Sequence, residues 1–304
     1  MVDLSVNLAG IKLKNPVIAA SGTFGYGQEF AKFYDLDKLG GISFKGTTLD
    51  PRKGNPPPRI ADCPSGMLNA VGLQNPGLES VVSKELPGMR RVFHNLILAN
   101  ISGFSVDEYV SLARRFDECG EVGIIEVNIS CPNVHGGGMA FGSDPAMAAQ
   151  VVGAVRKVAK KPLFIKLSPN VTDIVPIARA CVDAGCDGLS LINTLLGMRI
   201  DIAARRPVLA NVTGGLSGPA VFPVAVRMVY QVAKAVNVPI IGMGGISSSR
   251  DAVEMMLAGA TAVEVGTAGL VNPTAHVEII DGLEPLATKL GVDKISDLTG
   301  GAIR

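Results

Sequence analysis

A single cysteine, Cys131, stands among polar residues where an apolar run stops, in the segment EVNISCPN at 126–133. Residues 124–127 have the apolar, β-branched character of a buried strand, and Pro132 with the glycines at 136–138 prevents a continuing helix. Cys131, flanked by Asn128 and Asn133, is therefore expected at a strand end, where parallel α/β proteins present side chains to a ligand. The alternative is a small buried apolar thiol, as most free cysteines are. The polar neighbours favour a reactive group.

Lysine and asparagine side chains recur at the ends of five successive predicted strands. Each alone is weak evidence, because a lysine there is usually solvated and an asparagine usually closes a turn. In a parallel barrel these ends meet at one mouth, where together they would supply hydrogen-bond donors and acceptors to a planar anionic ligand. The residues are Lys45, Asn100, Asn128, Lys166, and the neighbours Asn193 and Thr194.

Glycines are concentrated after the last two predicted strands, in GMGGIS at 242–247 and GTAG at 266–269. Loops at these positions of α/β barrels commonly bind a phosphate, because glycine lets successive backbone N–H groups approach the anion. The same glycines could equally make tight turns into helices. Neither GMGGIS nor GYGQEF at 25–30 completes the G-x-G-x-x-G fingerprint of dinucleotide sites, so a mononucleotide fits better.

The elements that would position these groups alternate between short β-branched runs and longer amphipathic ones. Eight such strands predict a closed (β/α)8 TIM barrel formed by a single domain, 1–304, with an open doubly wound sheet as the structural alternative. The expected strands are 17–20, 41–45, 96–100, 124–128, 163–167, 188–192, 239–243 and 262–265. The expected helices are 106–119, 145–160, 174–184, 219–236, 249–258 and 274–290.

One connection, 46–77, breaks this alternation after the second strand. It is rich in glycine and proline and shows no helical pattern. A connection of that length is uncommon in a compact domain unless it has a function. We expect this loop insertion to cover the barrel mouth.

Composition narrows the possible partners. The 304 residues are 47% hydrophobic, and 28 basic against 27 acidic residues give a formal net charge of +1. That balance offers no electrostatic surface for nucleic acid or an anionic membrane. Residues 1–16 lack a basic region followed by an apolar core, and no later apolar run is long enough to span a bilayer, so we expect a cytoplasmic protein. The five cysteines contain no C-x-x-C pair, which argues against a disulfide framework, a metal site or an iron–sulfur site in this chain.

Nine motifs in order give the sequence a clear resemblance to the FMN-containing catalytic subunits of class 1 dihydroorotate dehydrogenases. GLQNPG and GGLSGPA most resemble class 1B, whose members pass electrons to NAD through a partner subunit carrying FAD and a 2Fe-2S cluster. Class 2 members use serine as base and carry an amino-terminal membrane-associating extension, a pattern this sequence does not follow. The motifs are ASGTFGYG, FKGTTLDPRKGNPPPR, MLNAVGLQNPG, EVNISCPN, FIKLSPN, INT, GGLSGPA, GMGGI and EVGTAGL.

The resemblance implies oxidation of (S)-dihydroorotate to orotate in pyrimidine (UMP) biosynthesis. Cys131 would be the base that removes a proton from carbon 5, while hydride leaves carbon 6 for the flavin, and 135–142 would be a lid over the substrate. The matching substrate-binding positions are Lys45, Asn69, Ala70, Val71, Gly72, Leu73, Asn128, Asn133, Asn193 and Thr194.

The same resemblance implies one FMN in each chain. Lys166 would lie beside the pyrimidine end of the flavin and stabilise its anionic reduced form. The matching FMN positions are Ser21, Lys45, Gly46, Asn100, Asn128, Lys166, Ile192, Gly218, Gly244, Gly245, Gly266 and Thr267.

The route of the electrons separates the alternatives. This sequence has no dinucleotide fingerprint and no clustered cysteines, so a separate molecule must reoxidise the flavin. We expect a partner subunit with FAD and 2Fe-2S, and a homodimer of this chain within a heterotetramer. A class 1A-like enzyme using fumarate and a related FMN barrel acting on another pyrimidine stay open. A non-catalytic FMN-binding scaffold is disfavoured by the combination of Cys131, Lys45 and Lys166.

Overall fold

The computed structural model describes residues 2–130 and 139–303, and its centre is a closed barrel of eight parallel strands. Each barrel strand pairs with the next one along the chain, and the last strand pairs with the first through Val263 and Val17. The predicted TIM barrel is thereby confirmed. The strands are β3 (Val17–Ala19), β4 (Gly41–Ser43), β7 (Leu96–Ile101), β8 (Ile124–Asn128), β9 (Leu163–Lys166), β10 (Gly188–Leu191), β15 (Ile240–Met243) and β16 (Ala262–Val265).

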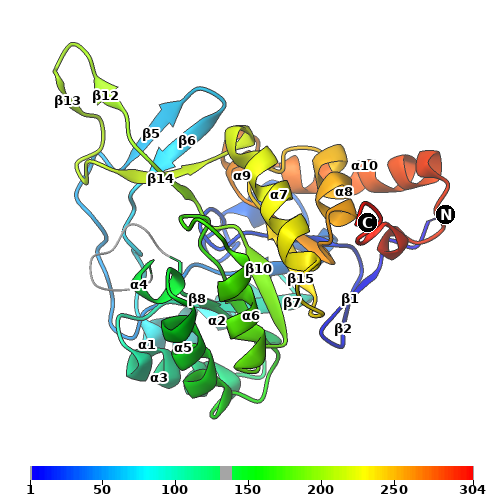
Figure 1. Cartoon of the computed structure of the whole chain (residues 1–304), viewed down its shortest axis with the longest axis horizontal. Coiled ribbons are helices and arrows are strands. Elements are labelled where there is room, and N and C mark those ends of the chain that lie inside the picture. The colour runs from blue at the N-terminus through cyan, green and yellow to red at the C-terminus, as the bar shows by residue number, and fades with distance from the viewer. Residues whose placement is uncertain (1, 131–138, 304) are drawn as a thin grey trace.

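All eight strands lie where the sequence predicts them, because their apolar residues are buried on both sides of the barrel wall. Every residue of β3, β4, β8, β9, β10, β15 and β16 is buried. This burial is typical of a parallel sheet covered by helices. The helices that surround the barrel (Figure 1) are α3 (Val106–Asp117), α5 (Pro145–Arg156), α6 (Val175–Asp183), α7 (Phe222–Ala233), α8 (Ser249–Leu257) and α10 (Ala275–Leu290).

Side-chain caps determine where several of these helices begin. Ser105 accepts a hydrogen bond from the backbone N–H of Glu108 at 3.2 Å, and Asp144 and Ser248 cap α5 and α8 in the same way. Such caps satisfy backbone donors that the first turn leaves unpaired. The predicted helix 219–236 differs in its first turn, which is a 3-10 turn over Pro219–Val221.

The connection 46–77 has more structure than the sequence indicates. It contains the hairpin β5 (Ile60–Cys63) and β6 (Gly66–Asn69), which joins β14 (Gly214–Ser217) and β11 (Leu195–Gly197) in a four-stranded sheet. With the small hairpin β12 (Ile200–Asp201) and β13 (Arg206–Pro207), this sheet extends away from one end of the barrel (Figure 1).

A further difference follows this connection, where the sequence predicts no helix. The structure has helical turns at α1 (Leu78–Ser80), a π-helical turn (Val81–Glu85) and α2 (Leu86–Arg90). Pro87 and Gly88 obscure this segment in the sequence, since both residues disfavour a helix interior. Pro87 is tolerated because it lies in the first turn of α2.

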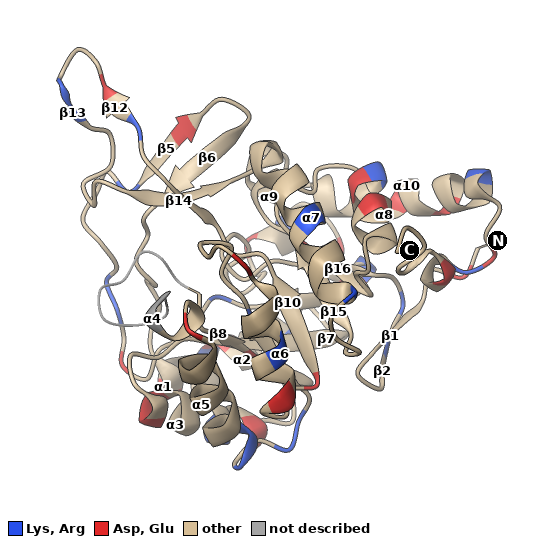
Figure 2. Cartoon of the chain, in the orientation of Figure 1, with Lys and Arg blue, Asp and Glu red and all other residues tan. Residues whose placement is uncertain are grey.

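The remaining elements are short. They are β1 (Val6–Leu8), β2 (Ile11–Leu13), α4 (Met139–Gly142), α9 (Thr267–Val271) and 3-10 turns at Phe30–Lys32, Leu36–Lys38 and Ile295–Leu298. Basic and acidic side chains are intermixed around the outside of the molecule in this view (Figure 2). Within the described residues, every helix is too short or too polar to cross a bilayer.

Candidate active site at the barrel mouth

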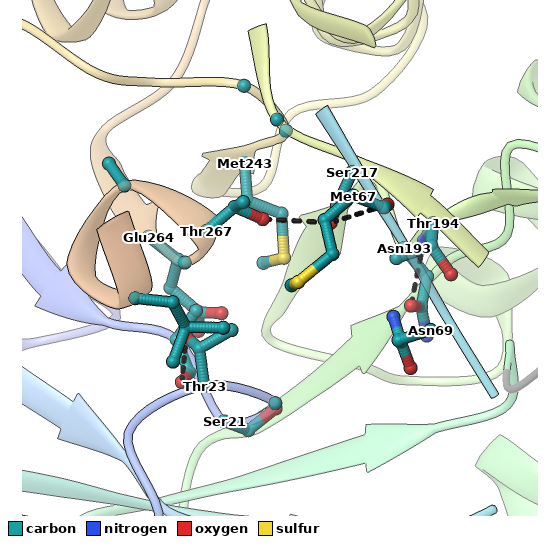
Figure 3. A pocket seen from close by; sticks show the side chains of 18 of the residues that line it. Ser21, Thr23, Met67, Asn69, Asn193, Thr194, Ser217, Met243, Glu264 and Thr267 are labelled. Carbon is teal, nitrogen blue, oxygen red and sulfur yellow. Dashed lines mark hydrogen bonds between the residues drawn. The ribbon is translucent and has the colours of Figure 1, made fainter. Parts of the chain in front are cut away.

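A cavity of about 390 Å³ lies at the carboxyl ends of the barrel strands. Its walls come from the strand ends, the loops after β15 and β16, and the sheet that carries β6 and β14 (Figure 3). The sequence-predicted site residues that line it are Ser21, Lys45, Gly46, Asn69, Val71, Gly72, Leu73, Asn100, Asn128, Lys166, Ile192, Asn193, Thr194, Gly218, Gly244, Gly245, Gly266 and Thr267.

A buried ion-pair network forms one part of this cavity. Nζ of Lys166 lies 3.2 Å from Oε2 of Glu264 and 3.9 Å from Oε2 of Glu126, so a cation from β9 lies between acids from β16 and β8. All three side chains are almost completely removed from solvent. Burying a charge is costly unless it is paired, and these contacts supply the pairing.

Glu126 accepts more hydrogen bonds than Glu264, although both acids are buried. Its carboxyl group accepts hydrogen bonds from Ser43 at 2.9 Å, Ser190 at 2.6 Å and the amide of Asn100 at 2.5 Å. Burial alone would raise the pKa of Glu126, but the charge of Lys166 and these three hydrogen bonds outweigh burial and lower it.

The pKa values of the other two groups of this network, Lys166 and Glu264, are raised. Burial alone would lower the pKa of Lys166, but the negative charges of Glu126 and Glu264 raise it. Burial raises the pKa of Glu264 to about 8, and the neighbouring Glu126 adds to that rise. At neutral pH Lys166 is therefore protonated and Glu126 is ionised.

An amide cluster forms another wall of the cavity. Asn193 donates from Nδ2 to Oγ of Ser130 at 2.8 Å and to Oδ1 of Asn128 at 3.3 Å, and its own Oδ1 accepts from the backbone N–H of Thr194 at 2.8 Å. Tyr109 fixes the backbone of Asn128 through a 2.8 Å bond from its hydroxyl group. These bonds hold the amides in fixed orientations, as recognition of a polar ring requires.

The glycine-rich loops approach one another at the opposite side of the cavity. Gly244 and Gly245 have φ of +119° and +82°, and a Cβ on Gly245 would lie 2.7 Å from the carbonyl oxygen of Gly218. Thr267 donates to Oγ of Ser217 at 2.8 Å, which ties the loop after β16 to β14 (Figure 3). Backbone packed this closely requires glycine and leaves N–H groups near the cavity, the arrangement that anion sites use.

The sheet above the barrel brings the connection 46–77 into the site. Asn69 pairs with Gly215 across β6 and β14, and a Cβ on Gly215 would overlap the side chain of Thr194. The prediction that this connection covers the barrel mouth is confirmed. Ala70 does not line the cavity, because its side chain packs with Leu68 and Leu209 in a small separate core.

The dihydroorotate dehydrogenase family model matches residues 3–286. The catalytic subunit of dihydroorotate dehydrogenase B (NAD(+)) from Pelobacter propionicus is 57% identical over 298 residues, which are 98% of each chain. The subunit of the same name from Alkaliphilus metalliredigens is 53% identical over 299 residues, again 98% of each chain. This chain belongs to the dihydroorotate dehydrogenase family.

Two of the residues predicted from the family motifs, Cys131 and Asn133, lie outside the described residues, as does the first half, 135–138, of the predicted lid 135–142. The other dihydroorotate dehydrogenase motifs converge on the cavity, apart from Ala70. The described residues hold no group of three or more potential metal ligands.

The sequence reasoning missed Glu126 and Glu264. Each is an acid within a strand whose immediate neighbours are apolar, in IIEVN and AVEV. That pattern is itself a signal, since a charged residue flanked by buried positions needs a buried partner. The other polar lining residues that were not predicted are Thr23, Ser217, Ser247, Asn272 and Glu278.

Proposed function

We propose that this chain, as one FMN-binding barrel domain over 1–304, oxidises (S)-dihydroorotate to orotate in de novo pyrimidine biosynthesis. The observation that carries the proposal is the convergence of lysines, asparagines and glycine-rich loops on one cavity in a member of the dihydroorotate dehydrogenase family. FMN would supply the hydride acceptor for carbon 6 of the substrate.

The cavity residues fit FMN by their chemistry. Oδ1 of Asn100 is buried and accepts no hydrogen bond from the described residues, so a ligand donor can use it. Lys166 offers a cation for the electron-rich end of the ring, and Gly218, Gly245 and Gly266 lie where backbone N–H groups would hold the phosphate. The cavity volume of about 390 Å³ lies within the usual range for small-molecule sites.

Residues of this chain remove the proton, exclude water and bind the substrate. Cys131 removes the proton from carbon 5 of dihydroorotate, and the lid 135–142 excludes water. Lys45, Thr194 and the side-chain amides of Asn69, Asn128, Asn133 and Asn193 hold the pyrimidine ring and its carboxylate. Each polar group of a buried ring that lacks a partner costs about 1–3 kcal/mol, which explains the number of amides.

The electrons that this chain takes from dihydroorotate pass to NAD through a partner subunit that carries FAD and 2Fe-2S. The relatives support this, since their names specify both NAD(+) and a catalytic subunit. We infer a cytoplasmic heterotetramer built on a homodimer of this chain.

The test is steady-state orotate formation by the purified FMN-loaded chain with an artificial electron acceptor. We expect orotate to form from dihydroorotate, and no oxidation of dihydrouracil, which lacks the carboxylate. Turnover of dihydrouracil in preference to dihydroorotate would mean that the chain is a related flavin barrel with another pyrimidine substrate.

A further inference from the structure

Glu126 and Glu264, the two acids beside Lys166, differ in the number of hydrogen bonds that they accept. Glu126 accepts hydrogen bonds from donors on three strands, β4, β7 and β10, through Ser43, Asn100 and Ser190. Glu264 accepts one from Lys166 at 3.2 Å, and its Oε1, also buried, accepts none from any described residue. A buried carboxylate with an unsatisfied oxygen is costly, whereas a protonated carboxyl group in its place is a donor.

The net charge of the network independently indicates that one of the two acids is protonated. With both acids ionised, the buried network would carry two negative charges against the single positive charge of Lys166. One proton on either acid removes the excess, and it is held more favourably by the acid with fewer donors. The negative charge of the neighbouring Glu126 also favours the protonated form of Glu264.

We propose that Glu264 holds a proton while Glu126 is ionised, and that Glu264 is a positioning residue that leaves the charge of Lys166 available to the flavin. This inference rests on the proposed function for its role, although the proton itself is a property of the protein without cofactor. Glu264 and Lys166 both line the cavity, so the network acts where the ligand lies.

The surroundings of Glu264 leave few other groups that could control its proton. Its strand neighbours, at Ile18 of β3 and Met243 of β15, are apolar. The charged groups that act on it are Glu126 and Lys166. Among the described residues, Lys45 is the other lysine that lines the cavity.

The role follows from electrostatics inside a water-excluded site. If Glu264 were ionised, two carboxylates would neutralise Lys166 and add a negative charge beside the flavin, which would oppose its reduction. With the proton in place, Glu126 balances Lys166 only in part at 3.9 Å, and the ammonium group stays close to the cavity.

Two isosteric variants test the assignment, because glutamine mimics a protonated glutamate and removes the charge of an ionised one. We expect Glu264→Gln to leave the FMN midpoint potential at neutral pH unchanged, and Glu126→Gln to raise it. At alkaline pH the wild-type potential should fall more steeply than that of Glu264→Gln, because only the wild type loses the proton. An equal rise of the potential in both variants at neutral pH would overturn the proposal.

Infrared spectroscopy of the apoprotein supplies a readout that does not depend on FMN or on turnover. The wild type should show the C=O band of a protonated carboxyl group at neutral pH, which disappears at alkaline pH and is absent from Glu264→Gln. If that variant does not fold, ¹³C-labelled glutamate in the wild type still shows whether the band comes from a glutamate. Absence of the band overturns the proposed proton on Glu264, whereas its presence in a chain that dihydroorotate cannot reduce would contradict only the proposed function.

Discussion

Nζ of Lys166 donates a 3.2 Å hydrogen bond to the carboxyl group of Glu264 inside the barrel, which joins β9 to β16 beside the cavity. A second acid, Glu126, reaches the same ammonium group from β8 at 3.9 Å. The lysine that the family resemblance assigns to the flavin is thus held by acidic side chains of the barrel itself.

Replacement of Lys166 by methionine tests this arrangement. The change leaves Glu126 ionised and buried without its counter-ion, and we expect it to lower the free energy of unfolding by about 3–5 kcal/mol. Urea unfolding of the apoprotein measures it. Lys289→Met, at an exposed position of α10, is the matched control and should change stability by less than about 0.5 kcal/mol. Equal stability of the two variants would mean that the buried pair contributes nothing.

The pH dependence of stability tests the proton on Glu264. Its pKa is raised by burial to about 8, well above the 4.5 of an unperturbed glutamate. The folded state therefore keeps a proton that the unfolded chain releases, and this stabilising contribution is lost as pH rises from about 4.5 to about 8. The glutamine of Glu264→Gln does not titrate, so the variant loses no stability from this site over the same pH range.

We expect the difference in unfolding free energy, Glu264→Gln minus wild type, to grow over that pH window by a few kcal/mol, since one pKa unit corresponds to about 1.4 kcal/mol. The slope from His276, whose pKa burial lowers to about 4, is common to both proteins and cancels. Urea titrations at several pH values measure the difference. A difference independent of pH would show that Glu264 titrates normally.

Gly245→Ala tests the phosphate side of the cavity. The added Cβ would lie 2.7 Å from the Gly218 carbonyl oxygen at a φ of +82°, so the loop must move and FMN affinity should fall more than tenfold. Gly291→Ala is a matched control, because Gly291 has a φ of +73° with no atom within 4 Å of the new Cβ. Both changes carry about 1–2 kcal/mol of backbone strain. Fluorescence titration with FMN should detect weaker binding in Gly245→Ala alone.

Cys131→Ala tests the proposed base. General base catalysis typically contributes about 10²–10⁴-fold, so we expect turnover to fall by that factor while FMN stays bound. Cys63→Ala removes another free thiol, one that does not line the cavity, and should keep full activity. An unchanged rate in Cys131→Ala would exclude this cysteine as the base.

The barrel could be predicted because its signals are local. Each strand is a short apolar run, and strand ends of parallel sheets must share one edge, so Lys45, Asn128 and Asn193 could be placed at one mouth without coordinates. The hairpin β5–β6 could not be predicted in this way, because it pairs with β14, where Leu68 lies opposite Leu216 far along the chain. Contacts over such a sequence separation leave no periodic trace in either segment.

The buried network was missed for a similar reason. A lysine at a strand end predicts a solvated charge or a ligand contact, and nothing local tells which acids will surround it. Glu126 and Glu264 become partners of Lys166 only when the barrel closes. The family resemblance named Lys166 by its motif, but the motif does not contain the groups that fix its charge.

The most direct test of the central claim is anaerobic mixing of the purified, FMN-loaded chain with dihydroorotate while the visible flavin absorption is followed. We expect the absorption to bleach, and neither NAD nor fumarate added alone to restore it until the partner subunit is supplied with NAD. Reoxidation by fumarate alone would make the chain a class 1A-like enzyme. A flavin-loaded chain that dihydroorotate does not bleach would contradict the account.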